Sequence, residues 1–354
     1  MKRREFLQTA AVAAPAAALA APAVAQGKLE WKLPTSFPSN APGVGTNVTN
    51  FAERVNAMSD GQLTLKVFSG GELVPPFGVE DAVQQGTAEI GHSTPYYAAS
   101  KNSALHFFSA VPFGMTAVET AAWLRHGGGQ EIWDEIYAAR GLKPFYSGNS
   151  GIQAAGWFKN PIESVDDLAG LNMRIAGLGG EAMRRVGVNA VLLPPPEIFP
   201  AFQSGTIDAA EWVGPMLDQA FGLQKVAQYC YVPAFHEPSA GLEIVVNQDA
   251  WDSLPPHLQA IVSAAAEAAE SASLAQFDYF NATAMRQLQE AGVTFAQFPD
   301  DVIAALKSAS AEVMAENSAA NPDFAKVEES YNAFLDLSKD YATAVKGPTF
   351  TQRM

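Results

Sequence analysis

The sequence has 354 residues, of which 48% are hydrophobic and 17% are charged, a composition that suits a globular protein of about two domains and excludes a disordered or fibrous chain. Its single cysteine, Cys230, excludes an internal disulfide and a thiolate zinc site. The net charge of −15 argues against nucleic acid as a partner, because phosphate contacts need clustered Lys and Arg.

Residues 1–25 have the parts of an export signal. A basic start with Arg3 and Arg4 is followed by a short apolar run and by an A-x-A cleavage motif at residues 23–25. The arginine pair is typical of a twin-arginine signal, so we expect export to the periplasm. No later run approaches the roughly 20 apolar residues of a membrane-spanning helix.

The chain after this signal begins with a predicted β-α-β unit. Alternating apolar residues predict strands over 29–33 and 62–68, and a three-four apolar spacing predicts a helix over 48–58 between them. A short helix ending at Gly86 and a strand follow, and a similar pattern recurs around Gly205. This recurrence indicates either two lobes of like construction or only the common helix-glycine-strand junction.

The middle of the chain alternates helix and strand, which is typical of the α/β class. The predicted order is a helix over 118–141, a strand over 142–148, a turn and strand over 164–177, a helix over 179–188 and a strand over 189–193.

A long helix follows Pro255 and Pro256 and runs without a breaker to Gly292. Its length of about 54 Å, at 1.5 Å per residue, is more than one lobe can bury, so we expect it to brace both lobes. Near the C-terminus, apolar residues from Phe324 to Val345 recur every three or four positions. This narrow seam packs either on its own subunit or on a second one.

The sequence offers little sign of catalysis. The five histidines lack metalloprotease spacing, there is no G-x-S-x-G motif, and the glycine-rich stretches match neither phosphate-binding loop. Binding is better supported, because a set of polar and aromatic residues lies beside glycine or proline at predicted strand ends, where α/β proteins place ligands. The set comprises Gln153, Arg174, Glu211, Trp212 and Glu237.

These residues lie in motifs that resemble a known family. The stretches "GTAEIGHS", "NMRIAG", "FPAFQSGTIDAAEWVGP", the "HEP" turn and "VNQDAWDSLP" occur in the order seen in the extracytoplasmic solute receptors of tripartite ATP-independent periplasmic (TRAP) transporters. The sequence most resembles the branch that binds a 2-oxo or 2-hydroxy monocarboxylate together with a metal cation. The resemblance implies delivery of the solute to a membrane permease.

The resemblance also implies a fold. It is an α/β periplasmic binding protein of two lobes, similar to type II, with a long helix spanning both lobes and a C-terminal helix extension. Lobe 1 would comprise residues 27–151 plus about 240–282, and lobe 2 residues 152–239 plus about 283–315. Residues 320–354 would form a dimerisation helix and tail, giving a homodimer.

Residue roles follow from the same resemblance. Arg174 would grip the ligand carboxylate with its planar fork, and Tyr96 or Tyr97 would reach the ligand from the first lobe. The cation, calcium or sodium, would be held by Gln153, Glu211, Glu237 and the backbone carbonyl of Trp212, so that three of these residues also border the substrate. The alternative for Glu211 is a solvated side chain or a salt bridge to Arg174. Bulky walls would limit the acid to a short one such as pyruvate or lactate. The expected walls are Trp157, Phe199 and Trp212, and for Phe199 a role in the core is an equal alternative.

Charge counting bears on the cation. One arginine, two glutamates and a monoanionic ligand sum to −2, which a divalent ion neutralises and sodium does not. Two other classes share the features above: a periplasmic ligand-sensing subunit of a signalling system, and a secreted enzyme acting on small organic acids.

Overall fold

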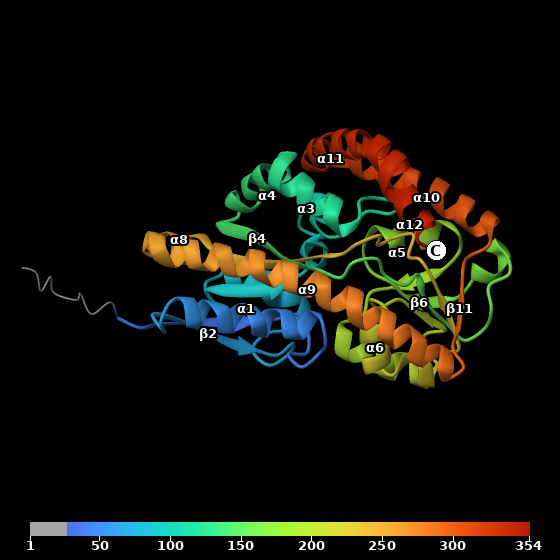
Figure 1. The fold of residues 1–354 in the computed structure, drawn as a ribbon, viewed down its shortest axis with the longest axis horizontal. Helices are drawn as coiled ribbons and strands as arrows, with labels where there is room; N and C mark the ends of the chain where they lie inside the picture. The colour runs from blue at the N-terminus through green and yellow to red at the C-terminus, as the bar shows by residue number, and fades with distance from the viewer. Residues whose placement is uncertain (1–26) are drawn as a thin grey trace, which may run out of the picture.

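Two sheets with their own helices form the two lobes of the molecule, and one long helix crosses both (Figure 1). The structure is a computed structural model in which residues 27–354 are described. The predicted signal peptide, residues 1–25, lies outside the described residues. The two-lobed α/β fold agrees with the prediction from the sequence.

The first lobe is built on strands from two separate parts of the chain, residues 29–149 and 241–247. Strand β10 (Gly241–Asn247) lies between β3 (Ile90–Ser93) and β4 (Leu142–Asn149) and is antiparallel to both. Beside them, β1 (Leu29–Pro34) pairs in parallel with β2 (Leu63–Phe68). Surrounding helices are α1 (Val44–Met58), α2 (Val79–Gln84), α3 (Ala117–His126), α4 (Gly129–Ala138) and α8 (Gln248–Ser253).

The single helix predicted over 118–141 is wrong. Helix α3 ends at His126 and α4 begins at Gly129, and between them Gly128 has φ 84°, a left-handed conformation that glycine adopts without a Cβ clash. The apolar spacing continues through both helices, which explains why periodicity alone did not reveal the break.

The second lobe has one mixed sheet of six strands in the order β11-β9-β5-β8-β6-β7. The strands are β5 (Gly156–Phe158), β6 (Asn172–Arg174), β7 (Asn189–Val191), β8 (Ala209–Ala210), β9 (Tyr229–Tyr231) and β11 (Thr294–Ala296). Its helices are α5 (Gly177–Arg185), α6 (Pro195–Ser204), α7 (Pro215–Phe221) and α10 (Asp300–Ala320). Short 3₁₀ turns lie at Pro76–Gly78, Pro95–Ala98, Ser103–Phe108, Val165–Leu168 and Leu223–Lys225.

Besides helix α9, two extended segments carry the chain between the sheets, one from β4 to β5 and the other from β9 back to β10. They run side by side and are joined by backbone hydrogen bonds. The N–H of Gln153 donates to the carbonyl of Glu237 at 3.3 Å, and the N–H of Ala234 donates to the carbonyl of Gln153 at 2.9 Å. Gln153 and Glu237 therefore lie where the two lobes join.

Helix α9 (Pro256–Glu290) has 35 residues, about 52 Å at 1.5 Å per residue, as the sequence predicts. Its first half buries residues such as Val262 and Ala265 in the core of the first lobe. Phe277 and Leu288 in its second half belong to the core of the second lobe. The helix thus forms a brace along one face of both lobes (Figure 1).

The C-terminal helix α11 (Pro322–Tyr341) packs against the first lobe mainly through its first half, and Phe334 and Leu335 are partly buried against the same core. Phe324, Val327 and Tyr331 are buried there, and the Tyr331 hydroxyl accepts a hydrogen bond from the N–H of Met115 at 2.6 Å. Farther along the helix, Leu337 and the seam residue Tyr341 are 76% and 60% exposed. A π-helical turn (Ala342–Lys346) and α12 (Gly347–Gln352) end the chain.

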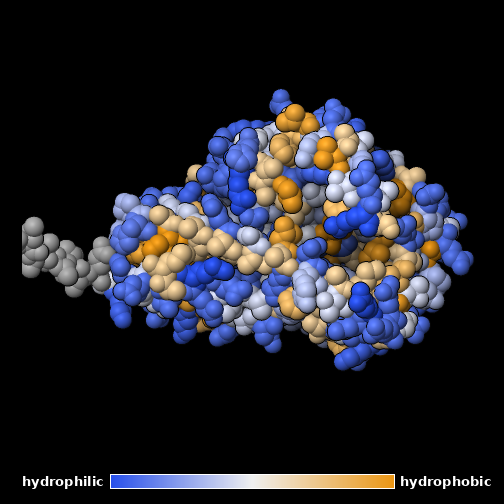
Figure 2. All heavy atoms as spheres, viewed as in Figure 1, coloured by the Kyte–Doolittle hydropathy of each residue, from blue (hydrophilic) through white to orange (hydrophobic). Residues whose placement is uncertain are grey.

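Figure 2 shows apolar residues following α9 across this face, with more of them over the C-terminal helices. Within the described residues, no helix is long and apolar enough to cross a membrane.

Candidate functional site

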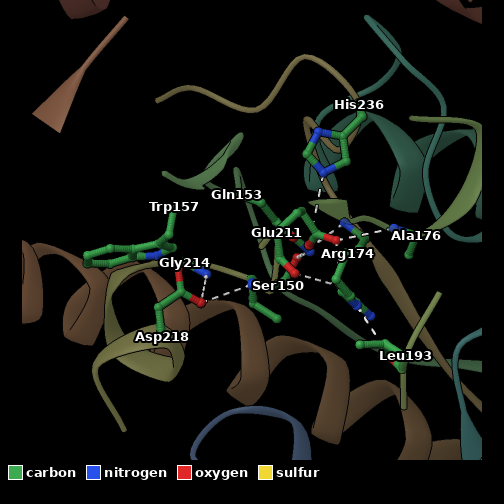
Figure 3. A network of polar contacts seen from close by, with 12 residues as sticks. Ser150, Gln153, Trp157, Arg174, Ala176, Leu193, Glu211, Gly214, Asp218 and His236 are labelled. Atoms are coloured by element: carbon green, nitrogen blue, oxygen red, sulfur yellow. Dashed lines mark hydrogen bonds and ion pairs between the residues drawn. The ribbon is translucent and has the colours of Figure 1, made fainter. Parts of the chain in front are cut away.

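A buried ion pair lies at the edge of the second sheet. Strands β6 and β8 are parallel neighbours, so their carboxyl ends meet at one edge, and Arg174 ends β6 while Glu211 follows β8. The Nη1 of Arg174 lies 2.6 Å from Oε2 of Glu211, and both side chains are 1% exposed. Figure 3 shows Glu211 at the centre of this network, with Arg174 on one side and His236 on another.

The guanidinium of Arg174 has one hydrogen-bonding edge left over. Its Nη1 also donates to the carbonyl of Glu211 at 2.8 Å, and its Nε donates to the carbonyl of Leu193 at 3.4 Å. Its Nη2 is buried and has no partner among the described residues. The group stacks over the Trp212 ring at 5.3 Å. The site therefore offers a fixed positive group with a free donor, which suits an anionic ligand.

Acceptor oxygens without partners gather beside this pair. Within the described residues, the buried Oε1 of Gln153, Oε1 of Glu211 and both carboxyl oxygens of Glu237 lack hydrogen bonds. The amide nitrogen of Gln153 donates to the Ser150 hydroxyl at 2.9 Å, so the amide oxygen is the atom that remains available to a ligand. Buried polar atoms without partners are rare and costly, and a positively charged group placed among these oxygens would satisfy them.

The electrostatics of Glu237 agree with that view. Burial raises the pKa of its carboxyl well above the ordinary value, and the nearby charge of Glu211 raises it further. A bound cation would reverse this balance, because it favours the ionised carboxylate. The donor set is mostly hard oxygen, the set that calcium and sodium prefer, so the residues present fit such an ion.

The two tyrosines approach the site from the first lobe. Tyr96 and Tyr97 are half-buried, their rings lie 5.2 Å apart, and burial raises the pKa of both hydroxyls. Both line a small cavity of about 20 Å³ between the lobes together with Gln153 and Trp212. Such a volume holds about one water molecule or ion, so a carboxylic acid needs the lobes or the side chains to move apart.

Two of the three expected walls lie elsewhere. Trp157 is fully buried in the core of the second lobe, where its Nε1 donates to Asp218 at 2.7 Å. Phe199 packs against the same core and does not line the cavity. Trp212 does line it, and the aromatic wall opposite is Phe37, which sequence reasoning missed. The ring centroids of Phe37 and Trp212 are 6.4 Å apart.

Sequence reasoning also missed two buried residues around the site. Asp218 accepts hydrogen bonds from the N–H groups of Val213 and Gly214 at 3.0 and 3.1 Å and so fixes the loop that follows Glu211. His236 lies with Glu211 and Glu237 in a cluster that could hold a metal ion. Its place next to Glu237 in the "HEP" turn was the available signal.

A family model and a known relative both match most of this chain. The family model for DctP, described as bacterial extracellular solute-binding protein family 7, matches residues 36–321. A monocarboxylate 2-oxoacid-binding periplasmic protein from Nostoc sp. (strain PCC 7120) is 41% identical over 342 residues, which is 94% of each chain.

Solved structures of TRAP solute-binding proteins are also similar to this chain. A TRAP transporter solute-binding protein from Bordetella bronchiseptica RB50, a dimer with copurified calcium and picolinate in one site, aligns with a TM-score of 0.90. It is 36% identical, and the match covers 92% of this chain and 97% of that one. A periplasmic TRAP protein from Pseudoalteromonas atlantica T6c with bound sodium and pyruvate has a TM-score of 0.89 and 36% identity, with coverage of 92% and 99%.

Proposed function

The chain belongs to the bacterial extracellular solute-binding proteins of family 7, the solute receptors of TRAP transporters, and we propose that it captures a small 2-oxo or 2-hydroxy monocarboxylate together with a cation. Pyruvate and lactate have the expected size. The receptor then delivers the acid to its membrane permease. The relatives that bind sodium or calcium with pyruvate or picolinate support this choice of ligand and ion.

The observation that carries the proposal is the meeting of two kinds of unsatisfied buried atoms. Arg174 presents a donor without a partner, while Gln153, Glu211 and Glu237 present acceptors without partners. A ligand carboxylate can accept a hydrogen bond from the Arg174 donor, and a cation can be coordinated by the acceptor oxygens. A 2-oxo or 2-hydroxy acid satisfies both at once, because a carboxylate oxygen and the neighbouring oxygen can complete the ion's coordination.

Residues from both lobes and from the crossover segments meet at the site. The two tyrosines belong to the first lobe, Arg174 and Glu211 to the second, and Gln153 and Glu237 to the segments between them. The tyrosines and Gln153 line the small cavity, and the charges of the other three residues act on the Tyr96 hydroxyl beside it. Leu178 of α5 also joins the apolar cluster of the first lobe, so the lobes are in contact here. A ligand that touches all of these residues stabilises the closed state by its differential contacts.

A thermal-shift screen tests the proposal. Protein stripped with a chelator in sodium-free buffer is mixed with C2 to C6 carboxylates, with and without calcium. A ligand at 100 times its Kd stabilises the folded state by about 2.7 kcal/mol, which raises Tm. We expect the largest shift with a short 2-oxo or 2-hydroxy acid plus calcium. Equal shifts with simple carboxylates, or indifference to the cation, would contradict the proposal.

We also propose that the protein works in the periplasm as a homodimer. The family is periplasmic, and the Bordetella relative is described as a dimer. The exposed apolar residues at the end of the chain support a second subunit as their partner: Leu337, Tyr341, Val345 and Phe350.

A further inference from the structure

The imidazole of His236 has an unusual environment. The residue is 1% exposed, and neither ring nitrogen has a hydrogen-bond partner among the described residues. Its Nε2 lies 4.0 Å from Oε1 of Glu211, which is too far for a hydrogen bond. Figure 3 shows the ring directed at Glu211 from the side away from Trp157. A buried imidazole with both nitrogens unused therefore faces the carboxylate cluster.

The spacing of the cluster matches ligands of one ion. Glu211, His236 and Glu237 each offer one ligand atom, and these atoms lie within 4.8 Å of one another. Two atoms that bind the same ion at about 2.0 to 2.6 Å each are separated by up to about 5 Å. The imidazole thus lies within reach of a cation that the two carboxylates hold.

The position of His236 is fixed by close packing. Gly179 of α5 lies against it, and a Cβ at Gly179 would be 2.4 Å from the Cβ of His236. The absence of a side chain at Gly179 lets α5 approach the "HEP" turn directly. The imidazole is therefore held in place before any ion arrives.

We propose that His236 supplies a nitrogen ligand to the cation site, so that the receptor also accepts a divalent first-row transition ion such as Mn²⁺, Co²⁺ or Zn²⁺. The inference rests on the proposed function, because it concerns the same site. Oxygen ligands suit calcium, whereas imidazole favours transition ions. The nitrogen widens the range of ions that can accompany the carboxylic acid.

Calorimetry of the metal-free protein tests this proposal. Co²⁺ and Ca²⁺ are titrated, each with pyruvate present, into the wild type, His236→Gln and the control His257→Gln, which changes an exposed histidine. We expect His236→Gln to weaken Co²⁺ binding by about tenfold or more and Ca²⁺ binding by less than about threefold. His257→Gln should leave both unchanged. Equal losses for the two ions, or none for Co²⁺, would overturn the proposal.

A second measurement does not depend on the variant folding. Pulsed EPR of the wild type with less than one equivalent of Mn²⁺ should detect a directly bound imidazole nitrogen, and its absence would overturn the role of His236. These measurements distinguish a failure of the proposed function from a failure of the role of His236. If the wild type binds neither calcium nor pyruvate, the proposed function fails as well. If it binds both but shows no nitrogen at the metal, only the inference about His236 fails.

Discussion

Arg174 and Glu211 form an ion pair that is withdrawn from solvent, and each depends on the other. Removing one partner of such a pair costs about 3–5 kcal/mol, because the remaining charge stays buried without compensation. With alanine at position 174, weaker ligand binding could therefore not be distinguished from lower stability of the fold. A variant that keeps the charge separates the two effects.

Arg174→Lys is the more informative change. A lysine keeps the positive charge beside Glu211 but loses the planar fork, and with it the Nη2 donor that has no partner among the described residues. We expect the affinity for pyruvate with calcium to fall by about tenfold to a hundredfold, the loss of one charge-assisted hydrogen bond. Calorimetry measures the affinity, and the melting temperature should change little.

The control for this experiment is Arg185→Lys. Arg185 pairs with Glu312 and Glu316 on the surface of the second lobe, where its side chain is 40% exposed. Exposed pairs contribute about 0–1 kcal/mol, so both affinity and stability should stay near those of the wild type. Binding by Arg174→Lys within twofold of the wild type would show that the fork does not hold the carboxylate.

At the scale of elements, the loop after β8 is held by a single buried carboxylate. Asp218 receives hydrogen bonds from two backbone N–H groups of this loop and from the indole of Trp157. We expect Asp218→Asn to lower the unfolding free energy by about 1–3 kcal/mol, because the amide cannot accept all three bonds with the same atoms. Ligand affinity should also fall, since the loop carries Glu211 and Trp212.

Urea denaturation and calorimetry measure the two effects. Asp208→Asn is a matched control, because Asp208 accepts hydrogen bonds from Asn172 at the exposed edge of the same sheet. If Asp218→Asn destabilises the fold but leaves ligand affinity unchanged, the carboxylate supports the core without positioning the site.

The packing of α5 against the "HEP" turn gives a second prediction. Gly179→Ala would normally favour a helix by about 0.5–1 kcal/mol. Here the new Cβ would lie 2.4 Å from His236, and forced overpacking costs about 1–3 kcal/mol. We expect lower stability and weaker binding of the cation and acid, measured by thermal melts and calorimetry. Gly180→Ala, whose Cβ would meet a carbonyl at 3.1 Å, should have a smaller effect.

The elements with the clearest patterns could be predicted from the sequence. The long helix α9 follows from an unbroken run after a proline pair, and strands such as β1 and β2 follow from strict alternation. The break between α3 and α4 could not, because the apolar period continues across it. The roles of Trp157 and Phe199 could not either, since the sequence does not show which face of a three-residue strand or short helix meets the ligand.

The candidate site divides in the same way. The positions of Arg174, Glu211, Gln153 and Glu237 beside glycine or proline singled them out, and the resemblance supplied the roles that we propose for them. The structure brings these residues together. The resemblance did not identify the residues that support the site through hydrogen bonds to the backbone or through packing. Asp218 lies three residues beyond the "FPAFQSGTIDAAEWVGP" stretch and Phe37 lies far from every motif, and only the fold shows that both support the site.

At the scale of the whole molecule, buried histidines make stability depend on pH. Burial lowers the pKa of His92 to about 3, and its ring contacts the Thr35 hydroxyl at 2.8 Å and Oδ1 of Asn47 at 3.0 Å. The unfolded state takes up a proton below about pH 6.5, whereas the folded state does not until near pH 3. This histidine therefore contributes stability above pH 6.5 that is lost as the pH falls.

The prediction is best tested as a difference. Asp218 and Glu237 have raised pKa values, and their titration works in the opposite direction. We expect the wild type to lose about 2 kcal/mol more unfolding free energy than His92→Gln between pH 6.5 and 5, as measured by urea denaturation. The exposed variant His257→Gln should follow the wild type. A His92→Gln curve parallel to the wild type would contradict the prediction.

The proposed dimer depends on the end of the chain, where the first part of the apolar seam is buried and the later part is exposed. Phe324, Val327 and Tyr331 belong to the core of their own lobe, so deleting the whole seam would damage the fold. Deleting residues 337–354 removes exposed apolar side chains and, within residues 27–354, a single ion pair, between Lys346 and Glu119. We expect the full chain to be a dimer by light scattering and the truncated chain to be a monomer that melts within a few degrees of it.

Pyruvate and calcium should bind both forms equally, because the residues of the proposed site lie outside the deleted segment. A truncated chain that remains a dimer would place the interface elsewhere, and a monomeric full chain would leave the exposed residues without the partner we propose.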